Sequence, residues 1–235
     1  MKISRRLIKW GGFLALMALA LFSVDRFVPN QHLPWRALDI HAPTGFATDL
    51  QLMRLSLSPS STCSATIESA RDYRTRPAER YRPNDECGWN VARHVDGSAS
   101  AGLDPLDVTM QCPLAVGLYI WMREVDDLAE QHLGSGVKYV NHYSAYSCRR
   151  QRGNGSGKWS EHAYANAFDI SGFRLEDGRE ITLLNDWNGA PDERAFLRAA
   201  RKEACKIFRV TLSPDFNDAH ADHFHVDMGP TTSCR

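Results

Sequence analysis

The sequence lacks several features that mark common classes of protein. Its 28 basic and 28 acidic side chains balance, so it has no excess of positive charge with which to hold nucleic acid. Its six cysteines form no Cys-x-x-Cys pair, which argues against a cysteine-based zinc knuckle or a redox motif. No internal repeat is present. Beyond the N-terminal segment, about 200 residues remain, enough for one domain with a hydrophobic core.

The N-terminal segment has the pattern of an export signal. A basic, acid-free stretch over residues 1–9 precedes an apolar run over residues 10–24. This run is shorter than the ~20 residues of a comfortable membrane span, and Ala18 and Ala20 offer only a weak cleavage site. We therefore predict either a signal peptide or an N-terminal membrane anchor over residues 1–28. In both cases the rest of the chain is exported to the periplasm or cell envelope, and a retained anchor would hold it at the inner membrane.

The cysteines all follow this segment. An even number of cysteines in an exported chain indicates a set of disulfides, although the sequence does not choose their pairing. Each bridge is expected to stabilise the fold by roughly 2–4 kcal/mol. A free catalytic thiol remains the alternative if one cysteine is unpaired. The predicted disulfide cysteines are Cys63, Cys87, Cys112, Cys148, Cys205 and Cys234.

The rest of the chain divides into a tether and a domain. Residues 29–58 are predicted to be a linker, rich in proline near its start and with a short helix near its end. Residues 59–235 are predicted to be one globular domain. Within it, the stretch over residues 58–102 is polar and irregular and is expected to form short strands and loops held by a disulfide. Residues 147–158 are expected to form a loop.

The domain is predicted to be of the α+β class. Pro113 and Gly134 bound the clearest helix, in which apolar residues recur at steps of three and four; Trp121 is expected in the core. A second helix is predicted over residues 192–205. Short strands are predicted over residues 137–143, 168–173, 180–184, 210–212 and 224–228. We therefore expect a small antiparallel sheet flanked by helices and held by disulfides.

Histidines and acids alternate with apolar residues near the C-terminus. In a strand, His223, His225 and Asp227 point to one face, while Phe224 and Val226 point to the other. Burying two imidazoles and a carboxylate in a row is unfavourable unless a metal or hydrogen bonds satisfy them. The His-x-His pair could instead be a coincidence of surface or core residues.

An earlier strand carries Asp169 in the same kind of alternation. If the two strands pair, Asp169 and His225 meet on one face, with His162 delivered by the preceding turn. Two histidines and one carboxylate give zinc three ligands and leave the fourth position for water, as in catalytic sites. A ligand set of His220, His223 and His225 is the alternative.

Four short motifs, which include the residues discussed above, resemble in their order the zinc peptidases of the LAS group, also called the M15-like or D-alanyl-D-alanine carboxypeptidase group. More narrowly, the chain resembles the bacterial extensin-like C-terminal domain family. The resemblance spans residues 63–227. The motifs that carry it are residues 146–149, 160–163, 166–169 and 222–227.

The resemblance implies that His162, Asp169 and His225 bind one Zn²⁺ per chain. It implies that His223 lies beside the metal as a base or a transition-state stabiliser. Other members of the wider group place an acid three residues before the last ligand, which is Asp222 here. The choice between Asp222 and His223 as the base stays open.

The resemblance also assigns roles around the ligands. Arg149 stands where the group often has an arginine that steadies the oxyanion or carboxylate of the substrate, although it could equally be a solvated loop charge. Ser160 is expected to support the ligand loop or to contact substrate. One departure is Ala165, where these peptidases usually have glycine.

The sequence therefore predicts a zinc metallopeptidase that cleaves an amide bond in peptidoglycan peptides, as a carboxypeptidase or an endopeptidase. The first alternative is a non-catalytic module with the same fold that binds peptidoglycan peptides. The second is an envelope scaffold whose histidine face meets a protein partner. No nucleic-acid partner is expected.

Overall fold

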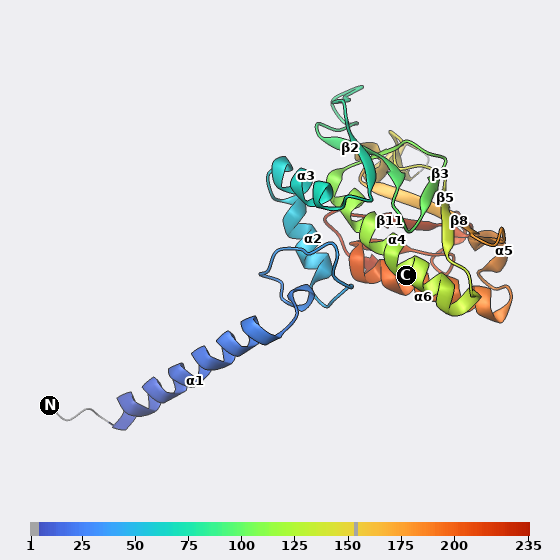
Figure 1. Cartoon of the computed structure of the whole chain (residues 1–235). Coiled ribbons are helices and arrows are strands. Elements are labelled where there is room, and N and C mark those ends of the chain that lie inside the picture. Colours follow the sequence, from blue (N-terminus) through green and yellow to red (C-terminus); the bar gives the residue numbers. More distant parts are fainter. Residues whose placement is uncertain (1–4, 153–154) are drawn as a thin grey trace.

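A computed structural model describes residues 5–152 and 155–235. A long N-terminal helix, α1 (Arg5–Phe27), projects away from a domain built on a sheet (Figure 1). Over Lys9–Phe27, 19 residues with a mean hydropathy of 1.4, α1 is long and apolar enough to cross a membrane, and none of this stretch is buried in the protein. This helix and the disulfides described below support export through a signal or an anchor.

The domain centres on a ten-stranded sheet in which most neighbours are antiparallel. Its main path runs β1-β2-β3-β5-β8-β11-β10-β12, with β4 beside β2 and β9 beside β8. The strands are β1 (Arg74–Ala78), β2 (Ala92–Gly97), β3 (Gly102–Asp104), β4 (Val108–Met110), β5 (Val137–His142), β8 (Ala167–Leu175), β9 (Glu180–Thr182), β10 (Val210–Leu212), β11 (Phe224–Asp227) and β12 (Ser233–Cys234). The pairs β3–β5 and β10–β12 are parallel. The α+β class is thus confirmed, although the sheet is larger and more mixed than predicted.

Two helices, α4 (Cys112–Leu133) and α6 (Pro191–Ile207), lie side by side against the sheet (Figure 1). Helix α4 has proline in its first turn and ends at Gly134, whose φ of 70° is the left-handed conformation that glycine adopts without steric cost. The fully buried Trp121 packs against Phe173 and donates its indole N–H to the carbonyl of Ala200 in α6, 3.0 Å away. The prediction that Trp121 is a core residue is confirmed.

The short strands predicted within residues 58–102 are present as β1 and β2, but other regular elements were not predicted. Helix α3 (Ser60–Ser69) begins the stretch predicted as loops and short strands, and the predicted loop before His162 forms a ribbon of β6 (Arg150–Arg152) and β7 (Ser156–Trp159). These elements have weak apolar periodicity, so sequence patterns do not reveal them. Short helical turns complete the chain: η1 (Asn30–His32), η2 (Glu161–Tyr164), α5 (Leu183–Asp186) and η3 (Asp218–His220).

The segment predicted as a linker packs on the domain. Leu33 and Ile40 are buried, and the short helix predicted near its end is present as α2 (Thr48–Ser56), which buries Leu52 and Leu55. Arg123 of α4 donates to the carbonyl of Ile40 at 2.8 Å. These apolar side chains are separated by prolines and charges, so their contribution to the core is not visible as a periodic pattern.

All six cysteines form disulfides, as predicted, and none is free. The pairs are Cys63–Cys112, Cys87–Cys148 and Cys205–Cys234. The first joins α3 to the start of α4, and the third joins α6 to β12. The second attaches the segment before β2 to the chain just ahead of Arg149, which fixes one wall of the region described next.

Candidate metal centre

His162 is presented by the short turn η2. Ser160 precedes this turn and its hydroxyl accepts a hydrogen bond from the backbone N–H of His162, at 3.3 Å. The turn ends at Ala165, which has a φ of 54° and donates its N–H to the carbonyl of His162 at 3.1 Å. Ser160 therefore supports the loop that carries His162. The position where the resemblance expects glycine is one where the backbone is left-handed.

Asp169 and His225 are brought together by the register of the sheet. Strands β8 and β11 are antiparallel, and the Cα of Asp169 pairs with that of His225. Phe168, Phe224 and Val226 are fully buried on the opposite face. The predicted alternation and pairing of these two strands are therefore confirmed.

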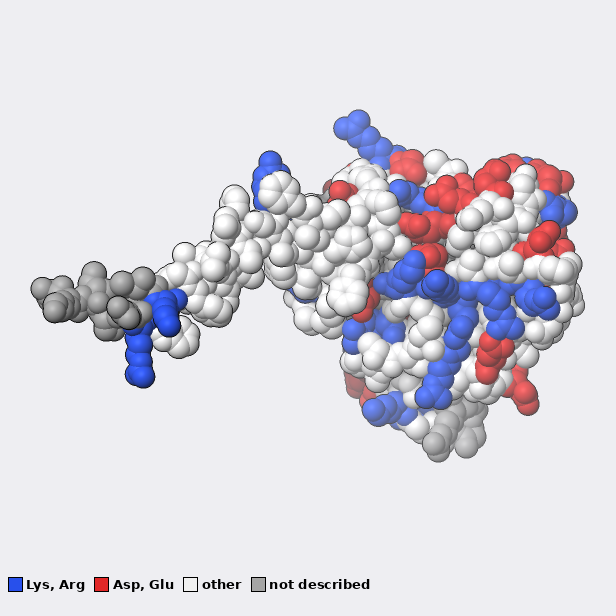
Figure 2. Space-filling model, turned by 90° about the horizontal axis from the view of Figure 1, so that it is seen from below, with Lys and Arg blue, Asp and Glu red and all other residues white. Residues whose placement is uncertain are grey.

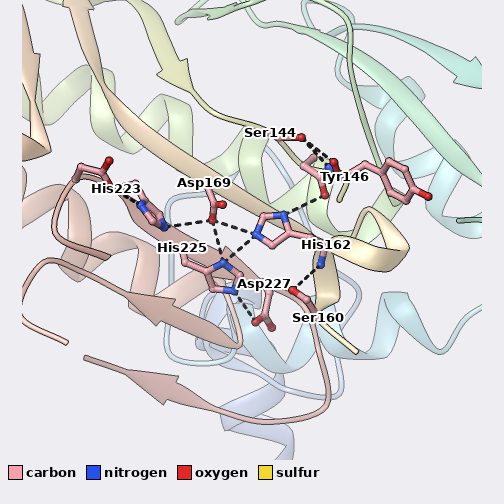
Figure 3. A network of polar contacts seen from close by, with 10 residues as sticks. Ser144, Tyr146, Ser160, His162, Asp169, His223, His225 and Asp227 are labelled. Carbon is pink, nitrogen blue, oxygen red and sulfur yellow. Dashed lines mark hydrogen bonds and ion pairs between the residues drawn. The ribbon is translucent and has the colours of Figure 1, made fainter. Parts of the chain in front are cut away.

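Three side-chain atoms converge where β8, β11 and η2 meet (Figure 3). Asp169 Oδ1 lies 3.1 Å from His162 Nε2 and 3.0 Å from His225 Nδ1. The two ring nitrogens lie 3.1 Å apart. His162 and Asp169 are buried and His225 is half-buried. Among the described residues, this is the cluster whose geometry could hold a metal ion. The alternative set of His220, His223 and His225 is not brought together in this way.

The far nitrogen of each imidazole has its own partner. His162 Nδ1 lies 3.3 Å from the carbonyl oxygen of Ala145, and His225 Nε2 lies 3.1 Å from Asp227 Oδ2. The other oxygen of Asp227 accepts the N–H of Gly229 at 2.8 Å. Metal-binding histidines typically donate their second N–H to a carbonyl or carboxylate in this way. The alternation of residues 223–227 predicts Asp227 on the metal face but gives it no role; its spacing of two residues from His225 is the signal that links it to this ligand.

These residues fit a zinc ion. Tetrahedral ligands at Zn–N and Zn–O distances of about 2.0–2.1 Å lie about 3.3 Å from one another, close to the separations in this cluster. The electrostatics agree with such a role. Burial raises the pKa of the Asp169 carboxyl, but hydrogen bonds with His162 and His225 outweigh burial and hold that pKa well below its ordinary value. Burial alone would lower the pKa of His225, yet hydrogen bonds with Asp169 and Asp227 raise it to about 9. The cluster thus stabilises positive charge next to an ionised carboxylate.

A second group of residues borders the cluster. His223 Nε2 lies 3.7 Å from Asp169 Oδ1, and its Nδ1 lies 2.7 Å from Asp222 Oδ1. The other oxygen of Asp222 accepts the hydroxyl of Tyr143 at 2.9 Å. The hydrogen bond with His223 is the main cause that lowers the pKa of Asp222. The contact of Tyr143, which directly follows β5, with Asp222 is not predictable from the sequence, because the two residues are 79 positions apart and share no motif.

An open cleft of about 480 Å³ leads to the cluster. Arg149 and Ser160 line it together with His223 and His225, so the structure brings all of these predicted site residues to one region. His220 lies at the same cleft, with its ring 5.1 Å from that of His223. Burial, followed by the neighbouring His223 and His225, lowers the pKa of His220 to about 4. Part of the cleft wall is apolar and is formed by Val210, Leu212 and Phe216; Leu212 is the strand partner of His225.

Fold and site together define a class of protein: a disulfide-linked α+β domain with a His–Asp–His cluster at the base of an open cleft. Residues 61–235 match the family described as "Extensin-like protein C-terminus", and the chain belongs to that family. The family membership predicted from the four motifs is therefore confirmed. No curated protein and no solved structure shows a significant match to the chain.

Proposed function

We propose that this protein is a zinc-dependent hydrolase that cleaves an amide bond in peptidoglycan peptides. The observation that carries the proposal is the convergence of three atoms within 3.1 Å of one another, from His162, Asp169 and His225. Bound there, Zn²⁺ supplies a Lewis acid and lowers the pKa of a coordinated water to about 7. Asp227 and the Ala145 carbonyl hold the two imidazoles in the tautomers that ligation requires.

His223 is placed to move the proton in this reaction. Its Nε2 faces the cluster, whereas both oxygens of Asp222 are engaged, one by His223 and the other by Tyr143. We therefore assign proton transfer to His223 Nε2 and orientation of its ring to Asp222. A general acid or base of this kind must lie within reach of the reacting atoms, and His223 is the nearer of the two residues left open by the sequence.

Arg149 supplies a positive charge to the same cleft. It is exposed, and it lines the cleft with His223 and His225. A guanidinium there can steady a developing oxyanion or bind a substrate carboxylate by paired hydrogen bonds. The apolar wall formed by Val210, Leu212 and Phe216 suits the aliphatic parts of a peptide.

The substrate class rests on two further points. The disulfides and the N-terminal apolar helix support export, which brings the domain to the cell wall. The ordered motifs also resemble those of the LAS or M15 peptidases, which implies peptides that contain D-amino acids. A carboxypeptidase and an endopeptidase share this chemistry.

Digestion of purified cell wall tests the proposal. Zinc-loaded wild-type protein and a His225→Ala variant are incubated with peptidoglycan, and the released products are identified by mass spectrometry. We expect new peptide termini with the wild type and none with His225→Ala, while His132→Ala, a histidine at the end of α4, behaves as the wild type. Equal digestion by wild type and His225→Ala rules out the mechanism. Retention of muropeptides by zinc-loaded protein without any product indicates the peptidoglycan-binding module instead.

A further inference from the structure

The last turn of α1 is joined to the segment that follows it. Asp25 accepts hydrogen bonds from the indole N–H of Trp35 at 2.9 Å and from Arg36 Nε at 3.0 Å. Arg36 Nη2 also lies 2.6 Å from the other oxygen of Asp25 and 3.1 Å from its backbone carbonyl. These contacts set the direction in which α1 leaves the rest of the protein.

Asp25 is unfavourable at this position without its partners. A carboxylate near the C-terminal end of a helix opposes the helix dipole, and ionisable residues within membrane spans are rare and are almost always paired. Arg36 neutralises the charge and Trp35 satisfies one of its oxygens. Trp35 and Arg36, which lie outside α1, thus provide the partners that allow Asp25 to stand at the end of a membrane-spanning helix.

That segment, residues 28–47, which we call the neck, is fixed to the domain. Gln51 of α2 donates to the carbonyls of Asn30 at 2.8 Å and Leu33 at 3.0 Å. Thr44 donates its N–H to Glu124 of α4 at 3.1 Å and its hydroxyl to Glu203 of α6, also at 3.1 Å. A continuous set of contacts therefore runs from α1 through the neck to the two main helices of the domain.

Large aromatic side chains are exposed at the end of α1 and along the neck. Phe27 is 79%, Trp35 53% and Phe46 86% exposed. Aromatic residues, tryptophan above all, are enriched at the boundary between membrane and water. At the other end of α1, Trp10 is 64% exposed next to Lys9. The 19 residues of Lys9–Phe27 span about 28 Å as a helix, close to the ~30 Å hydrocarbon core of a bilayer.

The distribution of charged residues along the chain is also that of a membrane-spanning helix. Figure 2 shows α1 as a largely uncharged rod between basic residues at its start and the charged surface of the domain. Between Trp10 and Val24 there is no charged residue. The positive-inside rule assigns the basic residues at the start of α1 to the cytoplasmic side and the six cysteines to the exported side.

We propose that α1 is retained as a membrane anchor and that the neck seats the domain directly on the outer surface of that membrane, with Trp35 and Phe46 in the lipid interface. The exposed surface of the neck thus contacts the headgroup region of the bilayer. The proposal does not depend on the hydrolase function, because it rests on α1 and the neck alone. Its consequence is that the cleft works close to the membrane rather than at the end of a flexible tether.

The test uses the full chain, expressed in cells and then reconstituted in vesicles of phosphatidylethanolamine and phosphatidylglycerol. Intact mass spectrometry of the protein from cell membranes establishes whether α1 is retained. Hydroxyl-radical labelling of the cells and of the vesicles then measures the oxidation of Trp35 and Phe46 in each, relative to the same residue in urea-unfolded chain. Tyr81, 45% exposed and outside the neck, is the internal reference.

We expect the full-length mass and several-fold stronger protection of Trp35 and Phe46 than of Tyr81. The double variant Asp25→Asn/Arg36→Gln should lose this protection while remaining in the membrane. The matched control Asp177→Asn/Arg179→Gln, which removes an exposed ion pair of 2.7 Å elsewhere, should keep it. A chain that lacks α1 overturns the proposal, as does oxidation of Trp35 and Phe46 at least as strong as that of Tyr81. Protection that occurs in cells but not in vesicles also overturns it, because the occupant is then a protein.

Discussion

Asp169 and His225 stand opposite each other on antiparallel strands β8 and β11, with Asp169 Oδ1 and His225 Nδ1 3.0 Å apart. Because side chains alternate along a strand, a shift of one residue in this register would move His225 to the apolar face. The buried Phe168, Phe224 and Val226 on that face therefore fix the register. The register that packs the core is therefore also the register that brings Asp169 and His225 together.

Asp227 is predicted to strengthen metal binding without being a ligand. In Asp227→Asn, His225 Nε2 loses its carboxylate partner, so its ring is held less firmly and is a weaker donor. Zinc affinity is expected to fall by roughly 10–100-fold. Competition with a chelating dye measures this. Asp222→Asn is the matched control, because Asp222 contacts His223 and not a ligand; an equal loss of affinity in both variants contradicts the assignment.

Asp222 and Tyr143 are predicted to act on catalysis rather than on the metal. Replacing Asp222 by Asn removes the carboxylate charge that orients His223 and puts an NH₂ group in place of one of its two acceptor oxygens. We expect kcat to fall by about 10²-fold with zinc content unchanged. Tyr143→Phe leaves Asp222 in contact with His223 and should have a smaller effect. Peptide hydrolysis and elemental analysis of the same samples separate the two roles. Loss of zinc in Asp222→Asn would show that the residue acts on the metal site.

The backbone at Ala165 predicts an unusual response to glycine. Ala163 and Ala165 are both fully buried, but only Ala165 has a positive φ, of 54°. Glycine relieves about 1–2 kcal/mol of steric cost in the left-handed region, which offsets the loss of one buried methyl group, about 0.8 kcal/mol. Ala165→Gly should therefore be close to neutral in urea unfolding. Ala163→Gly gains no such relief and should lose about 1–2 kcal/mol more. Equal losses in the two variants would exclude strain at Ala165.

The bridge between α6 and β12 is predicted to stabilise one edge of the cleft. Removing it in Cys205→Ser/Cys234→Ser opens a loop with a sequence separation of 29 residues, which corresponds to about 3–4 kcal/mol by the chain-entropy relation. Because Thr231 and Ser233 line the cleft, substrate binding should weaken as well. Cys63→Ser/Cys112→Ser should lower the free energy of unfolding without that second effect. Urea unfolding and the KM for a peptide substrate report the two quantities; an unchanged KM in the first variant counts against this role.

The parts of the fold that sequence patterns predicted are those with strong periodicity. The apolar stripe of α4 and the alternation around Asp169 and His225 belong to this group, and both depend only on neighbours along the chain. The pairing of the cysteines, the contact of Tyr143 with Asp222 and the packing of the neck depend on residues far apart in sequence. Asp227 combines the two kinds of feature. Its position on the metal face of the strand follows from the alternation of neighbouring residues, but its contact with the second nitrogen of His225 depends on how that ring is oriented.

The most direct test of the central claim is the zinc content of the purified, oxidised full chain. After reloading and removal of loosely bound metal, elemental mass spectrometry counts zinc per chain in the wild type, His162→Ala and His132→Ala. We expect about one zinc per chain in the wild type and in His132→Ala, and markedly less in His162→Ala. A wild type that holds no zinc, or a His162→Ala variant that holds as much as the wild type, would contradict the central claim.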